Sequence, residues 1–315
     1  MDKARNEVLR KLKDWAAATS DISSIVVAGS SARKDYPPDE FSDVDIVIFS
    51  SNASFYQKNF DWIHQIDTPV LYYKDRLDRN IVGRKVYFAN GVGLDIFFLD
   101  EKSVRWSYLY AKASRKKWLF AALPKPVKKI MNGAVFFFTE YIRRGFYCLV
   151  DKGKFEERLH YVNNTFTFKQ EAFSREKLEH VINSFWRYAL HTGINLQRRE
   201  YWHAKITCDH GMKKTLLVLI EIYTKVANGR DYDTWHHARF LEKWAAPFIV
   251  ERLPYIYGHY EMEDAWKCMK ETADLFSEIT RQIQEHIPDL DLLDPETHVR
   301  KWLEEMWVKE QALAG

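Results

Sequence analysis

Two stretches of the 315-residue chain decide its fold, VVAGSSAR at residues 26–33 and FSDVDIVI at residues 41–48. In the first, a β-branched run stops at a Gly-Ser pair, which is typical of a strand that ends in a turn. In the second, an Asp-x-Asp pattern formed by Asp43 and Asp45 leads into the next β-branched run. Either pattern alone is common in turns and at strand ends, so the prediction depends on their order and spacing.

Acidic residues inside apolar strands need an explanation, because buried carboxylates require partners. Residues two apart in a strand point to the same side, so Asp43 and Asp45 face a shared point. A later apolar run, LDIFFL at residues 94–99, adds Asp95. Carboxylates that close repel one another unless a cation lies between them, and Mg²⁺ is often held by carboxylates together with substrate phosphates. The sequence therefore predicts a Mg²⁺ site in which Asp43, Asp45 and Asp95 are metal ligands and catalytic residues.

The Gly-Ser corner predicts where a phosphate chain would bind. Gly29 permits close approach of the backbone, and the Ser30 hydroxyl and the amides of the turn can donate to phosphate oxygens. A short helix beginning near Ser31 would add the favourable dipole of its N-terminus, and Arg33 could contact a phosphate as a cation. We expect Gly29, Ser30 and Arg33 to bind the phosphates of a triphosphate.

The first hundred residues predict a small mixed α/β domain. Apolar residues at helical spacing indicate one helix over residues 3–19 and another over residues 55–66. Residues 90–93 (NGVG) separate two β-rich runs, which is a strong hairpin signal. The runs that are typical of strands cover residues 24–28, 44–49, 69–73, 85–89 and 94–99.

Beyond about residue 102 the strand patterns end, and long segments with helical periodicity follow. They cover residues 127–150, 177–196, 215–227, 238–250 and 265–286, with breaks at prolines and at Asn228-Gly229. We expect an α/β domain with a mixed sheet over residues 1–101, which carries the predicted metal site. We expect residues 102–315 to form an all-α helical bundle domain that binds the substrate.

Composition and charge narrow the class of protein. The net charge of +3 is far below that of a dedicated nucleic-acid binder, so we interpret the basic runs at residues 115–117 and 125–129 as solvated faces. The three cysteines form no CxxC pair, which argues against a zinc or redox motif. The N-terminus is charged throughout, and no run of about 18 apolar residues occurs. We expect a cytoplasmic protein with neither a membrane nor a nucleic acid as partner.

The motif residues resemble the nucleotidyltransferase superfamily of the DNA polymerase β type, whose pattern is Gly-Ser, Asp-x-Asp and a third Asp on a later strand. A narrower resemblance, running from residue 20 to about residue 280, is to the bacterial aminoglycoside 6-adenylyltransferases, the streptomycin-modifying enzymes. It implies metal-dependent transfer of AMP from ATP to a hydroxyl group, with release of pyrophosphate. The segments that carry it are PDEFSDVD (38–45), LVDK (149–152), FW (185–186), RRE (198–200), LL (216–217) and residues 231–240.

The chain departs from this family where the acceptor would lie. Its spacing suggests an additional helix over residues 118–145. Ile206 stands where the family carries an Asp in an Ala-Leu-Asp-His segment, with Asp209 one turn further on. The family's Gly-Lys-Asn-x-x-Lys segment corresponds here to residues 235–239 (WHHAR). The chemistry of nucleotidyl transfer therefore looks retained, whereas the acceptor and the general base stay open.

Candidate acceptor residues are carboxylates and aromatic side chains, since an aminoglycoside is polycationic and needs both. Each could equally be a surface charge or a core aromatic. His236 and Arg239 could contact phosphate from the helical domain, or could be ordinary residues of a first helical turn. The substrate candidates are Glu200, Asp209, Asp231, Asp233 and Trp235, together with Trp202 and Tyr232.

Three functions remain in competition at this point. The first is adenylylation of a small molecule, an aminoglycoside such as streptomycin, which would confer antibiotic resistance. The second is nucleotidyl transfer to a protein or to a tRNA end, which the basic and aromatic segment 114–129 keeps open. The third is a non-catalytic nucleotidyltransferase-like module that acts as an antitoxin or binding domain. Retention of all three carboxylates favours an enzyme.

Overall fold

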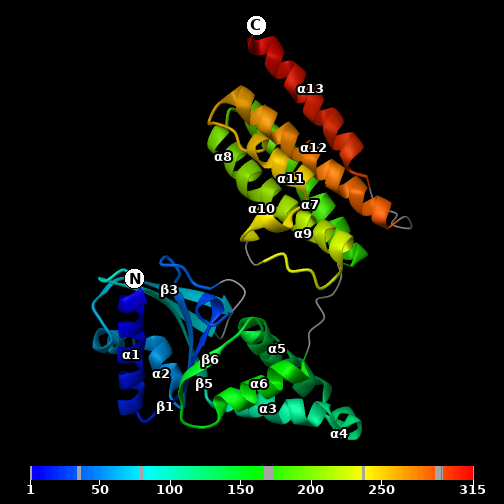
Figure 1. Cartoon of the computed structure of the whole chain (residues 1–315). Coiled ribbons are helices and arrows are strands. Elements are labelled where there is room, and N and C mark those ends of the chain that lie inside the picture. Colours follow the sequence, from blue (N-terminus) through cyan, green and yellow to red (C-terminus); the bar gives the residue numbers. More distant parts are fainter. Residues whose placement is uncertain are drawn as a thin grey trace. The chain divides into compact units, whose positions relative to one another are not determined.

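The computed structural model describes residues 2–33, 37–78, 81–166, 174–235, 238–287, 292 and 294–314 (Figure 1). The chain forms two compact units, Met1–Phe168 and Lys169–Gly315. The first contains a mixed sheet and the second is helical. The predicted fold class, α/β followed by all-α, is therefore confirmed.

The strands of unit 1 form one six-stranded sheet in the order β3-β4-β5-β2-β1-β6. Strand β2 pairs with β5 in parallel, and the other neighbouring pairs are antiparallel. β-branched and aromatic residues dominate these strands, as expected for a half-buried pleated surface. The bounds are β1 Ile22–Ala28, β2 Val44–Ser50, β3 Pro69–Asp78, β4 Ile81–Phe88, β5 Gly93–Asp100 and β6 Tyr147–Asp151.

Five of these strands were predicted, and the sixth was not. The expectation that strands end after residue 102 is wrong, because the segment predicted as a helix over residues 127–150 contains both α5 (Lys125–Ile142) and β6. The helix stops before Gly145, whose φ of +129° lies outside the helical region. The following run YCLVD then pairs with β1. Long-range pairing decided this segment, and helical periodicity alone could not reveal it.

Helices cover both faces of the sheet (Figure 1). One face packs on α1 (Asp2–Ala18) and α2 (Ala53–Lys58), whereas the other packs on α3 (Lys102–Ser114), α5 and α6 (Phe155–Thr165). The helix predicted over residues 55–66 is instead α2 followed by the 3₁₀ helix η2 (Asp61–Gln65), interrupted at Asn59, which is extended. Helix α4 (Lys117–Ala122) links α3 to α5.

The border between the units differs from the predicted domain boundary after residue 101. Strand β6 belongs to the sheet, and α3 and α5 pack on the sheet's face together with α6. These elements keep the chain within unit 1 as far as Phe168. The composition shift near residue 101 marks the change from strands to helices and not the end of the unit.

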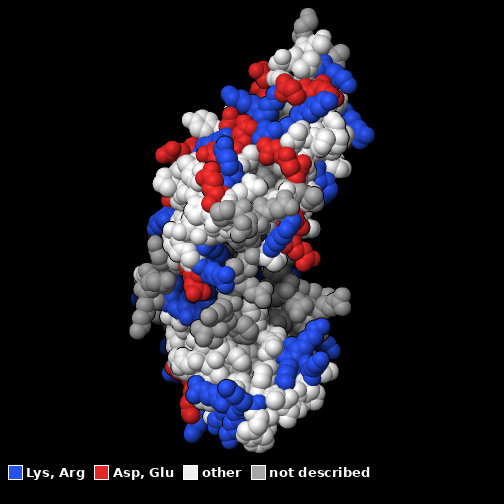
Figure 2. Space-filling model, turned by 90° about the vertical axis from the view of Figure 1, so that its right-hand side faces the viewer, with Lys and Arg blue, Asp and Glu red and all other residues white. Residues whose placement is uncertain are grey.

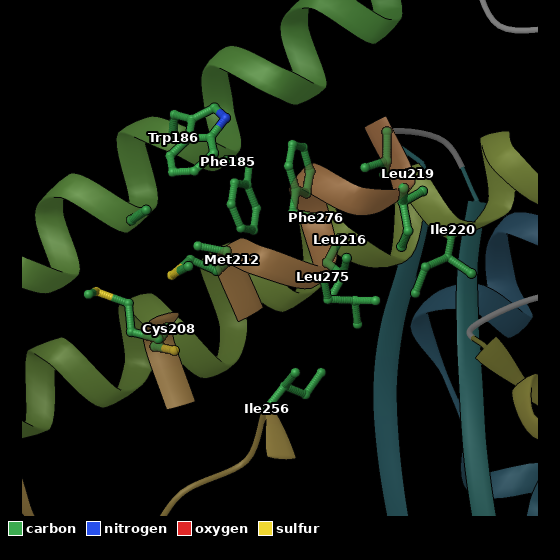
Figure 3. Packing of buried hydrophobic residues seen from close by; sticks show 14 of the residues in the cluster. Phe185, Trp186, Cys208, Met212, Leu216, Leu219, Ile220, Ile256, Leu275 and Phe276 are labelled. Atoms are coloured by element: carbon green, nitrogen blue, oxygen red, sulfur yellow. The ribbon is translucent and has the colours of Figure 1, made fainter. Parts of the chain in front are cut away.

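Unit 2 is built around long helices with aromatic side chains between them. Phe185 of α7 stacks on Phe276 of α12 with ring centroids 3.6 Å apart (Figure 3). The helix predicted over residues 238–250 is broken, because Ala246 is extended before Pro247. The helices are α7 Arg175–Gln197, α8 Tyr201–Ile206, the π-helix η3 Thr207–Met212, α9 Lys213–Asn228, α10 Leu241–Trp244, α11 Pro247–Arg252, the 3₁₀ helix η5 Leu253–Tyr255, α12 Met262–His286 and α13 Glu296–Ala314.

Among the described helices, none combines the length and the apolar character that crossing a bilayer requires.

We expect the stacked rings of Phe185 and Phe276 to stabilise unit 2. Phe276→Ala removes a fully buried ring and should lower the free energy of unfolding by about 3–5 kcal/mol, because it leaves a cavity. Tyr255→Ala is the matched control, since that ring is 65% exposed and its loss should cost less than about 0.5 kcal/mol. Urea unfolding followed by circular dichroism measures both. Similar losses in the two variants would contradict this packing.

Candidate active site

The Gly-Ser corner lies at the end of β1, where it starts a single 3₁₀ turn, Gly29–Ser31. Gly29 has a φ of +61°, which L side chains rarely adopt. Its neighbour Ala28 pairs with Asp45 across the sheet, and a Cβ atom on Gly29 would overlap the Asp45 carboxylate. Glycine is therefore required twice here, once by backbone conformation and once by the adjacent acid. Ser30 is buried in this turn.

The parallel pairing of β2 with β5 brings two of the predicted carboxylates together. Asp45 and Asp95 are register partners, so their side chains point to the same face of the sheet. Asp43 directly precedes β2 and acts electrostatically on the same neighbouring side chain as the other two. The three acids that the sequence singled out therefore converge beside the Gly29 turn.

Lys85 of β4 is a member of this cluster that the sequence analysis missed. It pairs with Asp95 in the antiparallel register, and its Nζ lies 2.9 Å from Asp95 Oδ2. The hydrogen bond to Asp95 raises the pKa of Lys85, and the charges of Asp95, Asp43 and Asp45 add to that rise. An alternation of apolar and polar residues along β4 would have placed Lys85 on the acidic face once the β4–β5 register was known.

Beyond Lys85, apolar residues continue the face that carries Asp45 and Asp95. Val47, Phe49 and Phe97 continue it along the two strands and pack under α5. Tyr141 of α5 lies edge-on to Phe97 with ring centroids 5.9 Å apart. Burial raises the pKa of Tyr141 well above its usual range, and the charges of Asp45, Asp95 and Asp43 raise it further. The carboxylates therefore border a low-dielectric surface on which charges interact strongly.

Arg5 of α1 holds the segment that leads to Asp43. Its guanidinium Nη2 donates to the carbonyl oxygens of Asp39 at 2.7 Å and Ser42 at 2.9 Å, and the side chain is buried. Asp39 in turn accepts hydrogen bonds from the Ser42 hydroxyl and from the Phe41 amide. No local sequence pattern predicts this role, because Arg5 has the spacing of an ordinary polar residue in an amphipathic helix.

The donor set fits a hard divalent cation. Three carboxylates gather beside one short turn, and carboxylates that close repel one another less when a cation lies between them. Carboxylate oxygens are also the ligands that Mg²⁺ prefers. Asp43, Asp45 and Asp95 would hold such an ion, with Lys85 beside Asp95.

The residues of unit 2 that were predicted to bind substrate or phosphate lie in two groups. The first group lies at α8 and the π-helix η3 that follows it. Asp209 is bonded to both Lys205 and Lys213, which neutralise its charge, whereas Glu200 is exposed at the start of α8. The second group lies in the segment that follows α9. Asp231 and Asp233 are exposed there, the Asp233 carboxylate accepts from the Trp235 amide at 3.0 Å, and Arg239 is exposed beside the Phe240 ring. His236 lies outside the described residues.

The Gly29 turn predicts the outcome of a pair of glycine substitutions. Gly29→Ala and Gly91→Ala both place alanine at positive φ, but a Cβ on Gly91 meets nothing within 4 Å. Gly91→Ala should therefore cost about 1 kcal/mol of folding free energy, and Gly29→Ala about 1–3 kcal/mol more, with loss of Mg²⁺-dependent nucleotide binding. Chemical unfolding and calorimetric titration with MgATP measure these effects. Equal unfolding free energies and equal MgATP binding in the two variants would contradict the close approach of Gly29 to the Asp45 carboxylate.

Comparisons with known proteins found relatives that match most of the chain. A curated aminoglycoside 6-adenylyltransferase from Campylobacter jejuni is 18% identical over 283 residues, which are 89% of this chain and 88% of that protein. One from Bacillus subtilis (strain 168) is 19% identical over 295 residues, 92% and 94% of the two chains. The solved aminoglycoside 6-adenyltransferase from Bacillus subtilis matches with a TM-score of 0.42 and 14% identity, covering 94% of this chain and 96% of that chain.

A model of the streptomycin adenylyltransferase family matches residues 2–306. That match includes the Gly29 turn, the three carboxylates and almost all of unit 2. The chain therefore belongs to the streptomycin adenylyltransferase family.

Proposed function

We propose that this enzyme transfers AMP from ATP to a hydroxyl group of an aminoglycoside such as streptomycin and releases pyrophosphate. The observation that carries the proposal is the convergence of Asp45 and Asp95 across the β2–β5 register beside the Gly29 turn. A turn that brings the backbone close to a ligand suits a triphosphate. The acids beside it suit Mg²⁺ and the reacting phosphate.

The chain's own residues would divide the work as follows. The Gly29–Ser31 turn binds the phosphates, and Asp43, Asp45 and Asp95 hold Mg²⁺, which when bound neutralises phosphate charge and orients the reacting groups. The acceptor oxygen forms a bond to the α-phosphorus as the bond to the β-phosphate oxygen breaks, and pyrophosphate leaves. Asp95 lies near the acceptor and either takes the hydroxyl proton or serves as a metal ligand, with Lys85 stabilising its negative charge at 2.9 Å.

The residues of unit 2 that we propose as contacts for the acceptor are chosen because an aminoglycoside is positively charged. Asp231, Asp233 and Trp235, with Tyr232, lie in one interhelical segment, where binding groups tend to collect. The exposed carboxylates there suit a polycation. Asp209 is a weaker candidate, because Lys205 and Lys213 already neutralise it, and Glu200 is exposed. Arg239 and His236 are proposed to contact phosphate.

One observation keeps a macromolecular acceptor in view as a second candidate. Residues 102–139 contain nine Lys or Arg and no Asp or Glu, and Trp118 is 73% exposed. Figure 2 shows clusters of Lys and Arg side chains at the lower end of the drawn face. Binding of tRNA that weakens steeply with added salt would favour this candidate. A net charge of +3 favours a small acceptor.

A direct test incubates the protein with Mg²⁺, each of the four nucleoside triphosphates and a panel of aminoglycosides that includes streptomycin. Pyrophosphate release and mass spectrometry of each drug are the readouts. We expect streptomycin to gain the mass of one AMP when ATP is supplied. Release of pyrophosphate without a modified drug would reject the acceptor, and no release with any drug would reject small-molecule adenylylation.

Asp95→Asn should reduce transfer about a hundredfold or more, since it removes a group that acts on the reacting atoms, while the sheet stays folded. Asp61→Asn is the control, because Asp61 is an exposed acid of η2, away from the β2–β5 pair. Turnover numbers with MgATP and the acceptor, together with circular dichroism spectra, measure the effect. Retained turnover in Asp95→Asn would remove Asp95 from the mechanism.

A further inference from the structure

A pocket of about 450 Å³ lies beside Ala32, the residue that follows the Gly29–Ser31 turn. Its walls come from the end of that turn, from the connection between α5 and β6, and from α6. The lining residues are Ala32, Ile142, Arg143, Arg144, Gly145, Phe146, His160 and Asn163. All of these described residues belong to unit 1.

The sheet register explains why these segments meet. Strands β1 and β6 are antiparallel, with Val27 opposite Tyr147. The residues that precede Tyr147 must therefore lie beside the residues that follow Val27, which form the Gly29 turn. The contact is close, since a Cβ on Gly145 would lie 2.6 Å from the Ala32 carbonyl oxygen. Gly145 allows the connection to approach the turn and to place its two arginines next to it.

The polar groups of the pocket suit an anion. Among the lining residues that the structure describes are two guanidinium groups, an imidazole and an amide, and none of these described residues is an acid. Arg143 forms an ion pair with Glu140 at 3.6 Å on an exposed surface, and such pairs contribute little and yield readily to a stronger partner. The His160 ring packs on Phe146 with centroids 4.4 Å apart, which fixes its position. Paired guanidinium groups recognise phosphate through bidentate, charge-assisted hydrogen bonds.

We infer that this pocket binds the β- and γ-phosphates of the nucleoside triphosphate and holds the pyrophosphate product. The inference rests on the proposed function and adds the residues that receive the leaving group. The carboxylates lie at the start of the Gly29 turn and the pocket at its end, about 6 Å apart along three residues of 3₁₀ backbone. A triphosphate lying along the turn would place its α-phosphate at the acids and its terminal phosphates at Arg143 and Arg144.

The test uses inorganic tripolyphosphate with Mg²⁺, titrated calorimetrically into the full chain, and orthophosphate and AMP as comparison ligands. Arg143→Gln/Arg144→Gln should weaken tripolyphosphate binding about tenfold or more and leave AMP binding unchanged. Arg143→Lys/Arg144→Lys should recover most of the loss. The matched control, Lys102→Gln/Arg105→Gln, removes two exposed cations of α3 in the same unit and should bind like the wild-type chain.

In turnover experiments the Gln pair should raise the KM for ATP much more than it changes kcat, which separates binding of phosphate from a merely structural role. If the Gln double variant does not fold, the single variants Arg143→Gln and His160→Gln replace it. Each should weaken tripolyphosphate binding by a smaller factor than the double variant. Tripolyphosphate binding can be measured even if no adenylylated product forms, so failure of the proposed function is distinguishable. The proposal that this pocket binds phosphates would be overturned if the folded Gln double variant bound tripolyphosphate as tightly as the control variant. It would also be overturned if the wild-type chain bound orthophosphate as tightly as tripolyphosphate.

Discussion

The structure of unit 1 depends on the repulsion between carboxylates that the β2–β5 pairing places side by side. Asp45 and Asp95 are register partners on a face where the following residues are apolar. Such an arrangement is unfavourable unless positive charge lies close by. Lys85 supplies a positive charge at 2.9 Å from Asp95, and the proposed divalent cation would add to it. Gly29 has no side chain because the Asp45 carboxylate occupies that space.

Elements far apart in the sequence maintain this arrangement. Arg5, near the N-terminus, fixes the segment before Asp43 through two carbonyl oxygens. Helix α5 covers the acidic face with Tyr141, and β6 returns to the sheet next to β1. The return of β6 brings Arg143 and Arg144 to the end of the Gly29 turn. Under the proposed function, the carboxylates and the two arginines would act at the two ends of one short turn.

Features of the fold and the site that depend on local sequence signals could be predicted, whereas features that depend on pairing between distant segments could not. The Gly-Ser turn and the strands around Asp45 and Asp95 follow from local signals, so the carboxylates and five strands were predicted. Lys85, Arg5 and Arg143 act through pairings between distant segments, which spacing along one chain does not reveal. Strand β6 was missed for the same reason, since its register with β1 overrides the helical pattern around it. Asp209 had the right chemistry for a polycation, but its partners Lys205 and Lys213 were not foreseen.

The claim that the three acids form a divalent-cation site is tested most directly by Mn²⁺ binding, followed by electron paramagnetic resonance of the free ion. The wild-type chain with ATP should remove Mn²⁺ saturably from solution. Asp45→Asn should weaken that binding about tenfold or more, because it takes one charged ligand from the site. Lys85→Met should bind Mn²⁺ at least as tightly as the wild-type chain. An Asp45→Asn variant that binds Mn²⁺ and ATP unchanged would contradict the account.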